Sequence, residues 1–285
     1  MGAGLVAGGP YSCARSYPLV LNCIHGNDKF PINLDVLIKQ VLVDNGKKID
    51  DIAGLRDDKV YILALQNDNI VRPPVVNKQY SLYTKFVNPS NILYETFSAA
   101  HTFPTDFDAP GNGECDKFKR PYIANCNFDT AGKILTHIYG PLNTKNTGEN
   151  MGRWIEFDQK ELHEKPSSIG LGKYGYLYVP STCTATDECR LHIVFHGCAQ
   201  SVHYSSNGLK FIKNSGYSRW ADTNKIILAF PQTQAVWKTT QGYPIHLGKI
   251  VACWDMFRMY DSDYENRNGQ QISAIRKLID LLITG

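Results

Sequence analysis

The sequence predicts an α/β fold in which helices pack on both faces of a mostly parallel sheet. Apolar runs of five or six residues, typical of buried strands, alternate along the chain with segments whose apolar residues recur at helical intervals. Internal repeats and low-complexity tracts are absent, which excludes a solenoid. A chain of 285 residues with 43% hydrophobic content can bury the core of one large domain. We therefore expect residues 1–285 to form a single domain.

The first half of the chain contains one clear helix and two clear strands. The segment 33–46, NLDVLIKQVLVDNG, spaces its apolar residues at helical intervals and ends in an Asn-Gly pair that stops a helix. VYILAL at 60–65 is a continuous apolar run and predicts a buried strand. NILYETFSAA at 91–100 predicts the next strand, so a strand–helix alternation is already present here.

The second half continues the alternation and closes with an amphipathic helix. Helices are expected at 131–140, 208–224 and 270–284, and strands at 174–180, 191–195 and 226–230. The polar stretch NTKNTGENMG at 143–152 is the best linker candidate. We interpret it as a surface connection within one domain, because the strands on either side of it would each form an implausibly small sheet.

Composition narrows the possible partners and the compartment. The net charge is +3, and no run of five or six like charges occurs, so neither nucleic acid nor a membrane surface is indicated. No apolar stretch approaches the roughly 18 residues that span a bilayer. The first ten residues, MGAGLVAGGP, lack the basic and long apolar regions of a signal peptide. A small neutral or polymeric partner is therefore favoured.

Eight cysteines point to an oxidising compartment. They are Cys13, Cys23, Cys115, Cys126, Cys183, Cys189, Cys198 and Cys253. Six of them form three close pairs separated by short polar loops, a spacing that suits disulfides better than metal cages. Spacing alone leaves the connectivity open. Because the N-terminal residues show no secretion signal, we expect that the chain does not begin at the original start.

Polar groups follow three of the expected strands, where reactive groups of open α/β sheets lie. Asp68 follows 60–65, His101 follows 91–100, and the turn HGCAQS, 196–201, follows 191–195. Alone, Asp68 could be a turn cap and His101 a hydrogen-bonded core residue. Together with backbone N–H groups in the turn, they predict the acid, the base and the oxyanion site of a serine esterase.

Metal catalysis is not predicted, and no organic cofactor is required by this chemistry. His192 and His196 would share one face of a strand, but no H-E-x-x-H motif or close Cys/His set accompanies them.

Several segments resemble the extracellular poly(3-hydroxybutyrate) depolymerases over nearly the whole length of the chain. They include VAGGPYSCA at 6–14, AAHTFPTDF at 99–107, LHIVFHGCAQS at 191–201 and CWD at 253–255. Their order resembles the circularly permuted fungal type, in which the oxyanion turn comes late in the chain. The resemblance implies an α/β-hydrolase fold that cleaves polyester ester bonds with a Ser-His-Asp triad.

The resemblance also assigns roles to individual residues. Asp68 is similar to the triad acid, His101 to the base, Cys198 to the donor of one oxyanion N–H, and Trp254 to the tryptophan that lines the substrate cleft. It further implies the disulfides Cys13–Cys23, Cys115–Cys126, Cys183–Cys189 and Cys198–Cys253.

The nucleophilic serine is missing from this pattern, because the sequence contains no G-x-S-x-G. Ser168 has Gly170 two residues on, but no apolar strand leads into it. Ser12 lies in an expected disulfide loop, and Ser201 is expected to satisfy local backbone groups. We expect the chain to be truncated at its N-terminus, to lack one strand–elbow–helix segment, and to be inactive alone.

Two other functions remain open from the sequence. One is a relative that binds polymer without turnover, using some of its 16 tyrosines and 12 phenylalanines. The other is a secreted esterase acting on feruloyl or acetyl groups of plant polysaccharide. For all three functions we expect an extracellular monomer whose partner is a polyester or another ester substrate, with no nucleic acid, membrane or metal partner.

Overall fold

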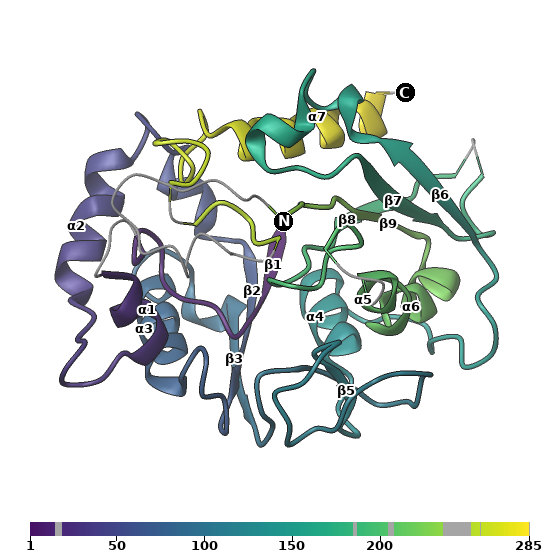
Figure 1. Ribbon diagram of the computed structural model, residues 1–285, viewed down its shortest axis with the longest axis horizontal. Coiled ribbons are helices and arrows are strands. Elements are labelled where there is room, and N and C mark those ends of the chain that lie inside the picture. The colour runs from purple at the N-terminus through teal and green to yellow at the C-terminus, as the bar shows by residue number, and fades with distance from the viewer. Residues whose placement is uncertain (15–18, 185–186, 205–207, 236–251, 257, 285) are drawn as a thin grey trace.

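The protein adopts the expected α/β fold, with its strands arranged in three sheets (Figure 1). The structure is a computed structural model that describes residues 1–14, 19–184, 187–204, 208–235, 252–256 and 258–284. Within these ranges no helix is both long enough and apolar enough to cross a membrane.

The first sheet consists of three parallel strands in the order β1 (Gly2–Val6), β2 (Lys59–Leu65) and β3 (Ile92–Phe97). The central strand β2 is apolar on both faces because helices cover both. Ile62 and Ala64 lie in a core cluster with Val76 of α3 (Pro73–Tyr83). Leu63, which points to the other face, shares a cluster with Ile134 of α4 (Thr130–Tyr139). The continuous apolar run VYILAL thus indicated a strand buried on both faces.

The second sheet has the order β6 (Arg153–Asp158), β7 (Tyr174–Val179), β9 (Ile226–Phe230) and β8 (Arg190–Ile193). β8 and β9 are parallel, whereas β6–β7 and β7–β9 are antiparallel, so the sheet is mixed. The long helix α7 (Gln270–Thr284) runs over one face, where its Leu278 shares a core cluster with Ala229 of β9 (Figure 1). On the other face Ala221 of α6 (Tyr217–Asn224) lies in one cluster with Leu228.

Helix α4 touches an outer strand of each of these two sheets. A Cβ atom at Gly4 of β1 would lie 2.5 Å from the side chain of Ile134, so the glycine allows the helix to approach the strand closely. At the end of the helix, the hydroxyl of Tyr139 donates to the carbonyl of Leu191 in β8 at 3.3 Å. One core cluster therefore contains residues of both sheets, among them Leu63 and Leu228.

The remaining elements are short. The third sheet pairs β4 (Phe103–Thr105) with β5 (Ile123–Asn125) in parallel. The other α-helices are α1 (Leu19–His25), α2 (Leu34–Asp44) and α5 (Gly208–Asn214), and the 3-10 helices are η1 (Ile52–Leu55), η2 (Pro89–Asn91), η3 (Gln159–Glu161) and η4 (Pro166–Ile169).

Most element predictions are confirmed, with shifts at the ends. The helix expected at 33–46 is α2, and the side chain of Asn33 caps it by accepting from the backbone N–H of Val36. The helix expected at 208–224 is wrong as one element, because Gly216 has a φ of +88° and separates α5 from α6. The strand expected at 91–100 already ends at Phe97, which leaves the residues before His101 to form a turn.

The polar segment 143–152 contains no helix or strand and is fastened to α6. The backbone N–H of Asn143 donates to the side chain of Asn224 at 2.7 Å, and the side-chain amide of Asn146 donates to Asp222 at 2.8 Å. Asp222 is fully buried and also accepts from the hydroxyl of Tyr178 in β7. The segment is therefore a surface connection held against α6 by hydrogen bonds of Asn143 and Asn146.

The structure confirms all four expected disulfides: Cys13–Cys23, Cys115–Cys126, Cys183–Cys189 and Cys198–Cys253.

Candidate active site

Asp68 and His101 form a hydrogen-bonded pair beyond the carboxyl ends of two adjacent strands. Asp68 follows β2 and His101 follows β3, and Nδ1 of His101 lies 2.6 Å from Oδ2 of Asp68. The other carboxylate oxygen accepts from the backbone N–H groups of Ile70 and Val71 at 2.7 and 2.8 Å. Because a carboxylate only accepts, Nδ1 of His101 carries the proton, and Nε2 is left to take one from another group.

Burial distinguishes the two members of the pair. The Asp68 side chain is fully buried, whereas 29% of the His101 side chain is exposed. The backbone on both sides of His101 is anchored to one loop, since Ala100 donates to the carbonyl of Cys115 and Phe103 to that of Tyr122. An orienting acid below a partly exposed imidazole is the arrangement that a general base needs.

The turn after β8 is held by two hydrogen bonds between Gly197 and Gln200. Gly197 accepts from the N–H of Gln200 at 3.2 Å, and the N–H of Gly197 donates to the Gln200 side chain at 2.8 Å. Ala199 has a φ of +63°, a value that non-glycine residues rarely adopt. Among the described residues, none accepts the N–H of Cys198. A backbone N–H without an acceptor in the protein is what an oxyanion donor requires.

His196 is buried beside this turn and is hydrogen-bonded at both ring nitrogens. It is 3% exposed, its Nδ1 donates to the carbonyl of Gly197 at 2.7 Å, and its Nε2 accepts from the N–H of Thr233 at 3.2 Å. Burial lowers the pKa of His196 to about 4, although the hydrogen bond to Gly197 opposes that shift. The imidazole is consequently neutral near pH 7, with both ring nitrogens occupied.

Trp254 lies beside the turn, held by the Cys198–Cys253 disulfide that precedes it. Its indole N–H donates to the carbonyl of His196 at 3.1 Å, and its ring packs edge-on against Phe195 at 5.0 Å. Phe195 is 49% exposed, so an aromatic surface borders the turn.

Sequence reasoning missed an aromatic residue that contacts His101. The ring of Phe118 lies 5.6 Å from that of His101 in an edge-on contact, stacks on Tyr122, and is 53% exposed. No strand or motif precedes Phe118, so no sequence pattern marks it. It also missed Gln200, although Gln200 belongs to the HGCAQS segment.

Two of the serines considered from the sequence, Ser201 and Ser168, form hydrogen bonds to other parts of the chain. The hydroxyl of Ser201 is buried, donates to the carbonyl of Thr233 and accepts from the N–H of His203 at 3.1 Å. The hydroxyl of Ser168 donates to the carbonyl of Lys165 at 2.7 Å.

The side chain of His192 contacts Tyr139 and not His196: its Nδ1 lies 3.1 Å from the Tyr139 hydroxyl. In the described ranges, no three His, Cys, Asp or Glu side chains are grouped so as to hold a metal ion.

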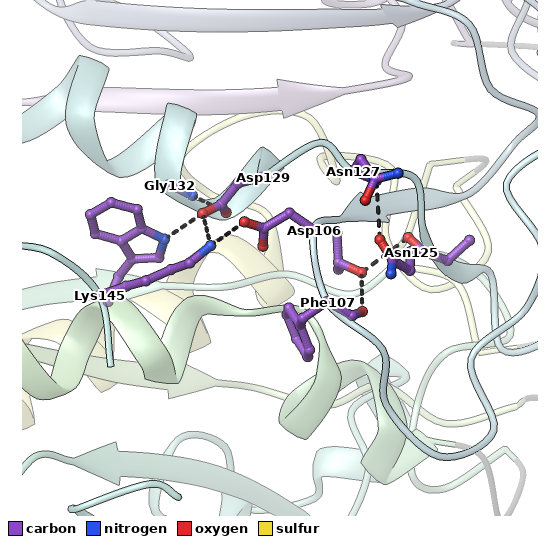
Figure 2. A network of polar contacts seen from close by, with 10 residues as sticks. Asp106, Phe107, Asn125, Asn127, Asp129, Gly132 and Lys145 are labelled. Atoms are coloured by element: carbon purple, nitrogen blue, oxygen red, sulfur yellow. Dashed lines mark hydrogen bonds and ion pairs between the residues drawn. The ribbon is translucent and has the colours of Figure 1, made fainter. Parts of the chain in front are cut away.

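Asp106, in the HTFPTDF segment (101–107), belongs to a separate network of polar contacts (Figure 2). Lys145 reaches the carboxylates of Asp106 and Asp129, the latter at 2.6 Å, and Asp129 also accepts from the indole of Trp220 at 2.9 Å. Burial would lower the pKa of Lys145, but the two carboxylates outweigh burial and raise it. Asp129 in addition caps α4 through Gly132. This network ties the segment 143–152 to β4 and α4 and has a structural role.

Solved structures place this fold in a known class. A PHB depolymerase from Penicillium funiculosum matches with a TM-score of 0.85 at 36% identity, over 96% of this chain and 84% of that one. A PHB depolymerase in a serine-to-alanine form, complexed with an R3HB trimer, matches with a TM-score of 0.84 at the same identity and coverage. The protein therefore has an α/β-hydrolase-type fold.

Sequence comparison gives the family. The chain is 36% identical to the polyhydroxybutyrate depolymerase of Talaromyces funiculosus over 294 residues, which is all of this chain and 82% of that protein. It is 34% identical to the poly(3-hydroxybutyrate) depolymerase of Delftia acidovorans over 292 residues, or 54% of that protein's length. The chain belongs to the polyhydroxybutyrate depolymerases. No protein-family profile matches it.

Proposed function

We propose that this chain carries the acid, the base and one oxyanion donor of a serine esterase that cleaves ester bonds in poly(3-hydroxybutyrate)-type polyester or its oligomers. The observation that carries the proposal is the 2.6 Å contact of buried Asp68 with Nδ1 of His101. The names of the relatives support the substrate, since both are depolymerases of this polymer.

In the proposed mechanism, Nε2 of His101 takes the proton of a serine hydroxyl as that oxygen attacks the ester carbonyl. The Cys198 N–H stabilises the oxyanion of the tetrahedral intermediate, and His101 then gives its proton to the leaving alcohol. A water repeats the sequence on the acyl-enzyme. Throughout, Asp68 keeps the proton on Nδ1 and stabilises the imidazolium ion.

We also propose that residues 1–285 do not contain the nucleophilic serine. The sequence has no G-x-S-x-G, and the hydroxyls of Ser201 and Ser168 both donate to backbone carbonyls. The order of Asp68, His101 and Cys198 along the chain supports our proposal of a circularly permuted arrangement, in which the oxyanion turn comes late. We therefore expect the chain of 285 residues to be inactive alone.

The test compares this chain with a chain extended by a strand–G-x-S-x-G–helix segment. Without the segment, hydrolysis of a short-chain ester should equal that of the His101→Ala variant. With it, hydrolysis of 3-hydroxybutyrate oligomers should appear, exceed that of feruloyl esters, and disappear again with His101→Ala. Turnover by the unextended chain that depends on His101 would contradict the missing nucleophile, and a preference for feruloyl or acetyl esters would contradict the substrate.

Polymer binding without turnover is a second candidate function, favoured by the exposed rings of Phe118 and Phe195 beside the site. Under this function the unextended chain adsorbs to polyhydroxybutyrate granules, and the double change of Phe118 and Phe195 to Ala releases it. A variant with the exposed Leu42 changed to Ala, on helix α2, serves as the control.

We also make proposals about the location, the domain organisation and the oligomeric state of the protein. Four disulfides support an extracellular location, since such bonds persist in oxidising environments. We also propose that residues 1–285 act as a single domain and a monomer, without nucleic acid or membrane partners.

A further inference from the structure

Gln200 uses all of its side-chain hydrogen-bonding groups to join two loops of the candidate active site. It is 8% exposed. Its Oε1 accepts from the N–H of Gly197 at 2.8 Å, and its Nε2 donates to the carbonyls of Pro121 and Tyr122 at 3.0 and 3.2 Å. The partners allow only one orientation of the amide, because one is a donor and two are acceptors.

Both loops adopt backbone conformations that need support. Ala199 in the turn after β8 has a φ of +63°, and Tyr122 in the loop before β5 has a φ of +59°. Such values cost on the order of 1 kcal/mol or more for residues with a side chain and persist only where surrounding contacts hold them. Gln200 is hydrogen-bonded to both segments: to the N–H of Gly197, two residues before Ala199, and to the carbonyl of Tyr122 itself.

The Tyr122 carbonyl also connects this bridge to His101. It accepts from Gln200 and, at 2.8 Å, from the N–H of Phe103, two residues after His101. From the same loop, the Tyr122 ring stacks on Phe118 at 4.9 Å between centroids, and Phe118 in turn contacts the imidazole of His101. Backbone and rings thus form two paths from Gln200 to the proposed base.

We propose that Gln200 is a positioning residue that sets the Cys198 N–H and His101 in register with each other. The inference rests on the proposed function, which gives these two groups their roles. Three residues of similar size or chemistry serve less well at this position: glutamate would face two carbonyls with an acceptor, methionine would satisfy none of the three partners, and asparagine is shorter by one methylene.

Nuclear magnetic resonance of the chain with its disulfides intact tests the inference without requiring turnover. Phe118→Ala first defines how the ring of Phe118 affects the imidazole signal of His101. In Gln200→Met and in Gln200→Glu, the imidazole signal of His101 should move in the same direction as in Phe118→Ala. The amide signal of Cys198 should also shift in both variants. Amide exchange at Gly197 should be about tenfold faster in Gln200→Met, the factor that loss of one hydrogen bond gives.

Gln79→Met is the matched control. Gln79 is 5% exposed and donates to the carbonyl of Gly9 at 3.0 Å, away from both loops. This variant should lower the unfolding midpoint while the signals of His101 and Cys198 stay in place. A Gln200→Met protein that is only less stable, with both signals unmoved, would overturn the inference.

If Gln200→Met does not fold, the unaltered chain still decides the matter. The two Nε2 protons of Gln200 should exchange slowly and show nuclear Overhauser effects to the loop around Tyr122. Rapid exchange of these protons would overturn the inference. Failure of the proposed function would appear separately, as a lack of turnover in the extended chain despite an intact Gln200 bridge.

Discussion

Acidification should destabilise the protein through His196, by an amount that follows from its environment. In the folded state, burial lowers the pKa of His196 to about 4, compared with about 6.5 for an unperturbed histidine. The unfolded chain therefore binds this proton first as the pH falls. The contribution of His196 to stability is fully present above about pH 6.5 and is lost progressively as the pH falls from 6.5 to about 4.

The size of the effect comes from the pKa difference. A shift of one pKa unit corresponds to about 1.4 kcal/mol, so the difference between 6.5 and about 4 gives a full effect of about 3 to 4 kcal/mol, of which about 3 kcal/mol is lost by pH 4. Between pH 7 and pH 5 the expected loss is about 2 kcal/mol. Part of the cost is structural, because a protonated Nε2 can no longer accept from the N–H of Thr233.

Urea unfolding at a series of pH values, with the disulfides intact, measures this loss. His196→Gln should be less stable at pH 7, since it disturbs contacts to Gly197 and Thr233, but its stability should depend less on pH by about 2 kcal/mol over this range. His163→Gln, on a surface turn, is the matched control for replacing a histidine with glutamine. If His196→Gln showed the same pH dependence as the unaltered protein, the assignment of a buried neutral imidazole would be refuted.

Two further predictions concern the fold. Replacing Cys198 and Cys253 with serine should lower the free energy of unfolding by about 4 kcal/mol, whereas replacing Cys183 and Cys189 should lower it by about 2 kcal/mol. The first pair closes a longer loop, because its cysteines are 55 residues apart and those of the second pair six. Equal losses in urea unfolding would contradict this loop-closure argument. Asp222→Ala should cost about 1–3 kcal/mol by removing the acceptor of three donors, of which the hydroxyl of Tyr178 is buried, and Asp222→Asn should cost less; a midpoint unchanged by Asp222→Ala would show that the carboxylate is dispensable.

Local patterns were sufficient to predict the elements that depend on local forces. The apolar run at 60–65 predicted β2, and the helical spacing at 270–284 predicted α7. The proximity of Asp68 and His101 was also predictable, because parallel strands end at the same edge of a sheet. The four disulfide pairings came only from the resemblance, since the spacing of cysteines does not define connectivity.

Other features could not be read from the residues. The break between α5 and α6 depends on the positive φ of Gly216, although the surrounding apolar pattern continues across it. The network of Lys145 depends on carboxylates 39 and 16 residues away, which no local pattern connects.

The sequence by itself determined the class of fold, the strand ends that carry Asp68 and His101, and the absence of a G-x-S-x-G motif. These are properties of residue type and short-range spacing. Only the tertiary structure decided that Gln200 bridges the turn of Cys198 to the loop at Tyr122, 78 residues earlier in the chain. The physical reason is that a buried amide must find partners for every donor and acceptor, and those partners exist only once the strands have brought distant loops together.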